Sequence, residues 1–293
     1  MIYIDYAATT PVRKDVMDKM LPYFLEKYGN PSSIYEFGQQ ARRAIDTARK
    51  TIADIIGCTP KEVIFTGSGT ESDNMAIKCI AEAYKNIGRH IITTKIEHQA
   101  VLHSCQYLEK NGYTVTYLDT DEYGTVNPED LKKAIQPDTI LVSIIYANNE
   151  IGTIQDIEAM SKIVRSARQN QYGPPFFHTD ACQAAGYLDI NIQNLGVDLM
   201  TINAGKIYGP KGIGALYIKK GLKITPLIHG GGQEYRMRAG TENVPEIIGM
   251  AEALKLAVQE KEEEVERITK LRNRLIDRGR ARFHRGGCCD PTE

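Results

Sequence analysis

The 293-residue sequence lacks several features that would each indicate a particular class of protein. No apolar stretch is long enough to span a bilayer, and residues 1–6 lack the basic region and long apolar run of a signal peptide. A net charge of -1 at pH 7 provides no basic field to attract nucleic acid or an anionic membrane surface. We therefore expect a cytoplasmic protein whose partners are small molecules or other proteins.

The cysteines also lack a pattern, because none of them forms a paired CxxC spacing. The six are Cys58, Cys79, Cys105, Cys182, Cys288 and Cys289. This distribution indicates neither a zinc site nor a disulfide framework, and the sequence predicts no metal site. Cys288 and Cys289 lie in a polar ending, residues 280–293, which has no periodicity and is predicted to be a flexible tail.

Short apolar runs alternate with helical patterns along the chain, which predicts a largely parallel sheet with helices on both faces. The expected strands are residues 62–66, 90–94, 114–118, 139–145, 175–180, 199–202 and 215–218. Helical spacing marks residues 71–84, 99–111 and 156–170, and a charged helical pattern covers 245–279. The last pattern is too long for one ordinary covering helix, so we expect it to connect domains or to pack on a partner.

Polar residues that could carry chemistry follow four of the predicted strands. In open α/β sheets, ligands bind beyond the carboxyl ends of the strands. Lys206 enters a Gly/Pro turn there, and a desolvated amine at that position could form a Schiff base. Asp180 could pair with a protonated pyridine nitrogen, and Thr70 ends a Gly-rich turn that could hold a phosphate at a helix start. His98 could stack on a ring and move protons.

Each of these residues also has an ordinary interpretation. A Gly-rich turn alone is more often punctuation, a single histidine is more often structural, and a lysine is usually a surface charge. Asp180 could simply end a strand or cap a helix. Their shared placement at strand ends distinguishes them, and together they favour pyridoxal phosphate as the cofactor.

The ordered motifs of the chain resemble the cysteine desulfurases of the NifS/IscS type, in the class V aminotransferase group of fold-type I pyridoxal-phosphate enzymes. The runs that carry the resemblance are residues 3–11, 29–33, 70–72, 97–98, 148–152, 180–183, 206–212, 229–232 and 236–241. So many motifs in order make a chance match implausible. The resemblance implies a cofactor-binding large domain over residues 1–250. Residues 251–293 would be a linker helix and a truncated remnant of a small domain that is otherwise missing.

The resemblance also assigns roles to individual residues. Gly69 and Thr70 would hold the phosphate, Asp180 would bind the pyridine nitrogen, and His98 would stack on the ring. The other implied cofactor-binding residues are Asn149 and Gln183, near the ring oxygen, together with Asn203, Lys206 and Thr241.

Lys206 and His98 are the catalytic residues that the resemblance implies. Lys206 would carry pyridoxal 5'-phosphate, release it to L-cysteine and move protons. The products would be alanine and an enzyme persulfide, passed to an iron-sulfur scaffold or another sulfur acceptor. Thr241 would reach the phosphate of a neighbouring subunit, which implies a homodimer.

Three departures from the family pattern leave alternatives open. Gly205 stands where the family typically has a phosphate-binding histidine, which should weaken cofactor binding by about 1.5 to 3 kcal/mol. Tyr35 stands where the family has another histidine. We expect the chain to end before the family's persulfide cysteine and its substrate-carboxylate arginine, and Cys288 or Cys289 is a poor substitute. The alternatives are a non-catalytic cofactor- or partner-binding remnant and a related class V lyase, such as selenocysteine lyase.

Overall fold

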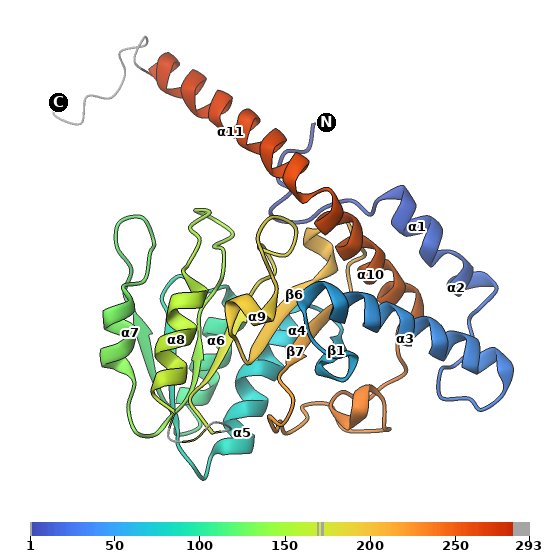
Figure 1. The fold of residues 1–293 in the computed structure, drawn as a ribbon, viewed down its shortest axis with the longest axis horizontal. Helices are drawn as coiled ribbons and strands as arrows, with labels where there is room; N and C mark the ends of the chain where they lie inside the picture. The colour runs from blue at the N-terminus through green and yellow to red at the C-terminus, as the bar shows by residue number, and fades with distance from the viewer. Residues whose placement is uncertain (1, 169, 171–172, 284–293) are drawn as a thin grey trace.

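A seven-stranded mixed sheet forms the centre of the computed structural model, which describes residues 2–168, 170 and 173–283 and the side chains through residue 278. The strands are β1 (Val63–Thr66), β2 (His90–Thr94), β3 (Thr114–Leu118), β4 (Thr139–Ser143), β5 (Phe176–Asp180), β6 (Leu199–Asn203) and β7 (Gly214–Ile218). Their order is β1-β7-β6-β5-β4-β2-β3, and β7 runs antiparallel to both of its neighbours while the other pairs are parallel (Figure 1). The predicted, largely parallel sheet is confirmed.

Helices cover both faces of this sheet, as the sequence predicts. They are α1 (Lys14–Met20), α2 (Pro22–Leu25), α3 (Glu36–Ile56), α4 (Gly69–Asn74), α5 (Ile80–Tyr84), α6 (Gln99–Glu109), α7 (Pro128–Ala134), α8 (Ile157–Ser166), α9 (Ile192–Leu195), α10 (Val244–Gln259) and α11 (Lys261–Phe283). A π-helical segment, η2 (Met75–Cys79), joins α4 to α5, and short turns of 3-10 helix are η1 (Pro60–Glu62), η3 (Ala204–Lys206) and η4 (Glu234–Arg236).

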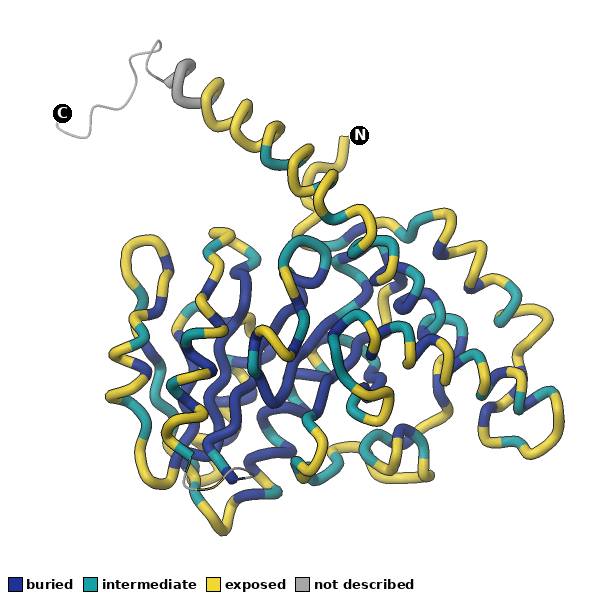
Figure 2. The backbone as a smooth tube through the Cα atoms, viewed as in Figure 1, coloured by how far each residue is buried: buried dark blue, intermediate teal, exposed yellow. Residues whose placement is uncertain are grey.

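Two apolar cores lie on opposite faces of the sheet, because successive strand residues point to opposite sides. Val63 and Phe65 pack in one core, with helices α1, α3, α8 and α10, whereas Ile64 packs in the other, with α5 and α6. Figure 2 shows the strands as the most deeply buried part of the chain. This packing leaves the carboxyl ends of the parallel strands uncovered, where a ligand can enter.

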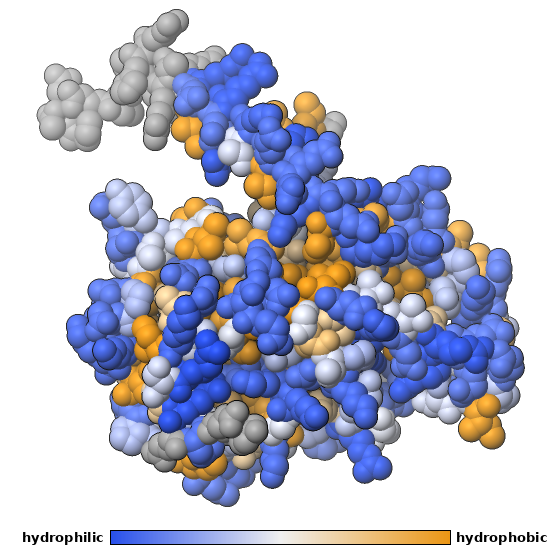
Figure 3. All heavy atoms as spheres, viewed as in Figure 1, coloured by the Kyte–Doolittle hydropathy of each residue, from blue (hydrophilic) through white to orange (hydrophobic). Residues whose placement is uncertain are grey.

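The predicted long helix over residues 245–279 is divided at Glu260, whose backbone (φ -97°, ψ 0°) departs from α-helical geometry. α10 packs on α3 and α1, but α11 extends away from the body of the molecule (Figure 1). Its apolar side chains Leu271 and Leu275 are exposed. Figure 3 shows small apolar patches among polar atoms along the part of the chain that extends from the body. Within the described residues, no helix is long and apolar enough to cross a membrane.

The predicted flexible tail, with Cys288 and Cys289, lies outside the described residues apart from the end of α11. The division of the chain into residues 1–250 and 251–293 stays a prediction. α3 was not anticipated from the sequence. Its buried residues Ala41, Ile45, Ala48, Ile52 and Ile56 recur at helical spacing, but no side chain caps its first turn at Tyr35.

Candidate functional site

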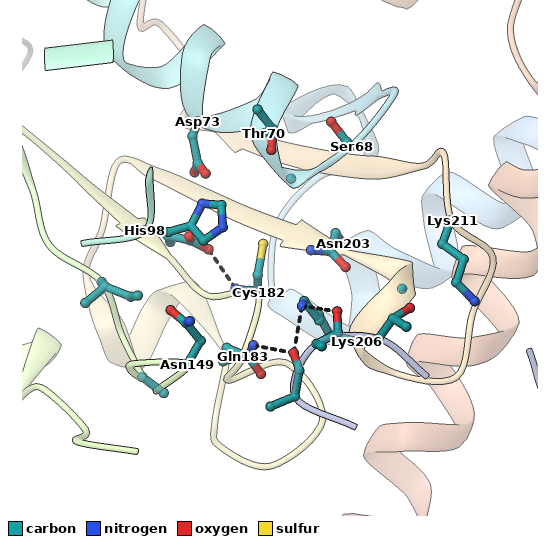
Figure 4. A pocket seen from close by; sticks show the side chains of 18 of the residues that line it. Ser68, Thr70, Asp73, His98, Asn149, Cys182, Gln183, Asn203, Lys206 and Lys211 are labelled. Carbon is teal, nitrogen blue, oxygen red and sulfur yellow. Dashed lines mark hydrogen bonds between the residues drawn. The ribbon is translucent and has the colours of Figure 1, made fainter. Parts of the chain in front are cut away.

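A pocket of about 420 Å³ lies beyond the carboxyl ends of β1, β2, β5 and β6 (Figure 4). The structure brings into this pocket every predicted cofactor-binding residue except Thr241. The residues that do line it are Gly69, Thr70, His98, Asn149, Asp180, Gln183, Asn203 and Lys206. The convergence follows from the topology, because parallel strands deliver the residues after their carboxyl ends to one edge of the sheet.

Lys206 ends the η3 turn that follows β6, and its amine points into the pocket. The Nζ atom donates hydrogen bonds to the carbonyl oxygens of Ala7 and Ala8, each at 2.7 Å. Gln183 Nε2 donates to the same Ala7 oxygen at 3.0 Å. The N-terminal segment, nearly two hundred residues away in sequence, therefore forms the wall of the pocket beside the lysine.

The opposite part of the pocket is acidic. Asp180 ends β5, is only 5% exposed, and its Oδ1 accepts the backbone N–H of Cys182 at 2.9 Å. His98 caps the start of α6, where its Nδ1 accepts the N–H of Ala100 at 3.1 Å, which in the neutral ring places the proton on Nε2. A carboxylate oxygen of Asp180, one of Asp73 and a ring nitrogen of His98 all lie within 4.8 Å of one another.

The Gly-rich turn after β1 forms a third side of the pocket. Ser68 caps α4 by accepting the N–H of Glu71 at 3.1 Å, so the N–H groups of Gly69 and Thr70 belong to the first turn of a helix and have no partner within it. A side chain at position 69 would place its Cβ 2.8 Å from Cys182 Sγ. Only glycine at position 69 therefore lets the backbone approach Cys182 this closely. The N–H groups of Gly69 and Thr70 are then available to an anion.

These groups fit pyridoxal phosphate. The pocket volume of about 420 Å³ is within the range of small-molecule sites. Lys206 supplies an amine for the aldehyde, Asp180 supplies a carboxylate for the pyridine nitrogen, and the start of α4 supplies N–H donors for the phosphate. One pocket thus presents partners for all three reactive or charged groups of the cofactor.

Thr241 lies elsewhere. It lines a smaller cavity of about 220 Å³ on the other side of the Gly67 turn, beside Arg238. Arg238 pairs with Glu71 at 2.8 Å, and Glu71 Oε2 accepts the N–H of Gly67 at 2.8 Å. The segment that carries Thr241 is therefore held against the Gly-rich turn at Gly67, and Thr241 does not line the pocket of its own chain.

The two positions that depart from the family pattern differ in their surroundings. Gly205 lines the pocket, and a Cβ there would meet Asn203 Oδ1 and Lys211 Cγ at 3.7 Å, which is ordinary contact. A larger side chain can therefore be accommodated. Tyr35 precedes α3, is 62% exposed and is not among the residues that line this pocket.

Sequence reasoning missed Asp73 and treated Cys182 as packed in place. Both line the pocket. Asp73 follows Thr70 by three residues, a spacing that places both on one side of a helix and could have revealed it. Cys182 is buried, and desolvation, followed by the charges of Asp180 and Asp73, raises the pKa of its thiol well above the usual range. Cys182 is therefore a poor nucleophile.

Comparison with known proteins agrees with the geometry of the pocket. The aminotransferase class-V family matches residues 2–285. Cysteine desulfurase IscS of Dictyoglomus turgidum is 56% identical over 275 residues, which are 94% of this chain and 68% of the relative. A solved NifS-like protein superposes with a TM-score of 0.91 at 43% identity, over 94% of this chain and 74% of that structure.

A second solved structure, SspA in complex with cysteine, superposes with a TM-score of 0.82 at 40% identity. The match covers 87% of this chain and 72% of the SspA chain. Class V aminotransferases of the desulfurase type depend on pyridoxal phosphate, in agreement with the groups that line the pocket. The fold, the pocket and these similarities together show that the chain belongs to the aminotransferase class-V family, as a relative of the NifS/IscS cysteine desulfurases.

Proposed function

We propose that this chain binds pyridoxal 5'-phosphate in the pocket at Lys206 and uses it to remove sulfur from L-cysteine, leaving alanine. The observation that carries the proposal is the convergence of an amine, a buried carboxylate and helix-start N–H groups in one pocket. No arrangement of surface residues would be expected to place these three groups together. The similarity to cysteine desulfurases selects L-cysteine as the substrate.

In this proposal, different residues of the pocket bind different parts of the cofactor. When bound, the cofactor supplies an electron sink for bond cleavage at the substrate. Gly69 and Thr70 bind the phosphate with backbone N–H groups, and Asp180 holds the ring nitrogen. Asn203 also lines the pocket, and its side chain lies against Gly69. Its Nδ2 is 3.0 Å from the position that a Cβ at residue 69 would take.

Lys206 moves protons. Its amine is held by the carbonyl oxygens of Ala7 and Ala8, so it is oriented before substrate arrives. His98 stacks on the ring, while Asn149 and Gln183 lie on the ring-oxygen side. These roles follow the family resemblance and the placement of each residue at the pocket.

The proposal includes a homodimer. Thr241 does not reach the pocket of its own chain, and its segment is braced from behind by the Arg238–Glu71 pair. A neighbouring subunit that received Thr241 would gain one more phosphate ligand. The sulfur would pass to an iron-sulfur scaffold or another acceptor protein.

The test is product formation by the purified 293-residue chain, with added pyridoxal phosphate, L-cysteine and a thiol reductant. We expect alanine and sulfide in equal amounts, and their loss in Lys206→Ala. Borohydride reduction followed by peptide mass spectrometry should place the cofactor on Lys206 and not on Lys211, which also lines the pocket. Bound cofactor without products would instead support the non-catalytic alternative, and attachment at Lys211 would contradict the assignment of Lys206.

A further inference from the structure

Asp73 is a buried acid of the pocket that has no place in the roles described above. It lies on α4, its side chain is 1% exposed, and it lines the pocket together with Asp180 and His98. Within the described part of the chain, its Oδ1 atom has no hydrogen-bond partner. Figure 4 shows the carboxyl group directed toward His98 and the interior of the pocket. A buried polar atom without a partner calls for a functional explanation.

The groups that face Asp73 are two acids, two histidines, a thiol and a hydroxyl. They are Asp180 and His178 of β5, Glu97 and His98 before α6, and Cys182 and Thr201. His178 Nε2 approaches Asp73 Oδ1 at 3.7 Å, but burial lowers the pKa of this histidine to about 3. Its ring nitrogens are occupied by Ser143 and Thr201. His178 therefore supplies no positive charge to balance an ionised Asp73.

Asp180 occupies the neighbouring position, within 4.8 Å of Asp73. Two carboxyl groups this close in a buried site do not both ionise readily, because each charge opposes the other and burial opposes both. Burial first, and then the charge of Asp180, raise the pKa of Asp73 well above its usual range, against a hydrogen bond from Thr201. Asp180 differs from Asp73 in its contacts, because its Oδ1 accepts a backbone N–H at 2.9 Å whereas the Oδ1 of Asp73 accepts no hydrogen bond from the described residues.

We infer that Asp73 is a positioning residue that remains a neutral carboxylic acid, so that the wall it forms with Asp180 carries one negative charge, located on Asp180. The protonation of Asp73 is a property of the chain itself. Its consequence, a single carboxylate charge presented to a cofactor nitrogen, depends on the proposed function. An alternative arrangement, in which both acids ionise and share a divalent cation with His98, is distinguished by the experiment.

The experiment compares chemical unfolding of the full chain, without cofactor and in EDTA, with that of Asp73→Asn from about pH 5 to pH 7. An acid that is protonated when folded and ionised when unfolded makes the folded state less stable as pH rises. The unfolding constant of the wild type, divided by that of Asp73→Asn, should therefore increase about tenfold per pH unit. A fixed cost of the substitution shifts this ratio without changing its slope.

Two matched variants control the slope. Glu97→Gln removes another buried acid of the same cluster, whose pKa burial raises to about 8, and should give a similar slope over the same pH range. Asp54→Asn removes an exposed aspartate of α3, paired with Lys50, and should give none. A flat ratio for Asp73→Asn over this range, with the slope present for Glu97→Gln, would overturn the inference.

Replacing EDTA with Mn²⁺ tests the cation alternative. The inference predicts equal effects of Mn²⁺ on the stability of wild type and Asp73→Asn, and a stabilisation confined to the wild type would overturn it.

A measurement of cofactor binding separates the protonation of Asp73 from the proposed function. If the wild type shows the slope but binds no pyridoxal phosphate, the proposed function fails and the protonation of Asp73 stands. If the wild type binds pyridoxal phosphate but shows no slope, the inference about Asp73 fails and the proposed function stands.

Discussion

Removing either member of the buried Arg49–Glu234 pair should strongly destabilise the fold. Glu234 begins the η4 turn, where Glu234, Tyr235 and Arg236 have φ values of 44°, 56° and 66°. This left-handed conformation is unfavourable for residues other than glycine, so surrounding contacts must maintain it. The Glu234 carboxylate accepts hydrogen bonds from Arg49 Nη1 and Nη2 at 2.7 and 2.6 Å and from the backbone N–H of Phe65 at 2.9 Å.

The magnitude follows from burial. The two side chains are 2% and 3% exposed, and breaking a buried ion pair by removing one partner typically costs about 3 to 5 kcal/mol. In Glu234→Leu, Arg49 would keep its bond to the Val63 carbonyl at 2.6 Å and its contact with the Phe65 ring at 4.6 Å. The turn would also be free to relax and admit water. We therefore expect a loss near the lower limit, about 3 kcal/mol.

Urea unfolding of Glu234→Leu, Arg49→Met and the double variant completes a double-mutant cycle. The double variant should lose less stability than either single variant, because it leaves no lone buried charge. Arg43→Met is the control, since Arg43 lies on the same helix in an exposed pair with Glu36 and should matter little. Single variants that lose less than about 1 kcal/mol, or a double variant whose loss equals their sum, would refute this reasoning.

Three further predictions concern the pocket. Gly205→His has room at its Cβ and adds a phosphate donor worth about 1.5 to 3 kcal/mol, so cofactor dissociation constants should fall tenfold or more relative to Gly205→Ala. No tightening would mean that the side chain does not reach the phosphate. Gly69→Ala should destabilise the fold by about 1 to 3 kcal/mol in thermal unfolding through overlap with Cys182 Sγ, and Gly69→Ala/Cys182→Ala should recover most of the loss. Because burial raises the pKa of Cys182, iodoacetamide should label it only after unfolding, and labelling of the native protein, detected by mass spectrometry, would show a reactive thiol.

Strand positions and the main pocket could be predicted from the sequence because both depend on short-range patterns. Each strand is a compact apolar run, and the rule that ligands bind beyond parallel strand ends brings Asp180 and Lys206 together without knowledge of the packing. The antiparallel direction of β7 was not predicted. It depends on the pairing of Gly214–Ile218 with β1 and β6, and the periodicity of a strand does not specify the direction of its neighbours.

The parts of the site that escaped prediction depend on contacts between distant segments. Nothing near Lys206 in sequence indicates that its amine bonds to Ala7 and Ala8. Asp73 was missed for a different reason, because an aspartate in the second turn of a helix usually faces solvent. Only the packing of α4 against β6 and β7 shows that this one is buried.

The position of Asp73 connects the two parts of the pocket that the proposed function assigns to the phosphate and to the ring. Thr70 and Asp73 lie on one side of α4, so the helix whose first N–H groups are proposed to bind the phosphate also carries a carboxyl group toward Asp180. If Asp73 were ionised, its charge would oppose the anion held a turn away as well as the charge on Asp180. A neutral Asp73 avoids both repulsions, so the same protonation state suits both parts of the pocket, the one proposed to bind the phosphate and the one proposed to bind the ring.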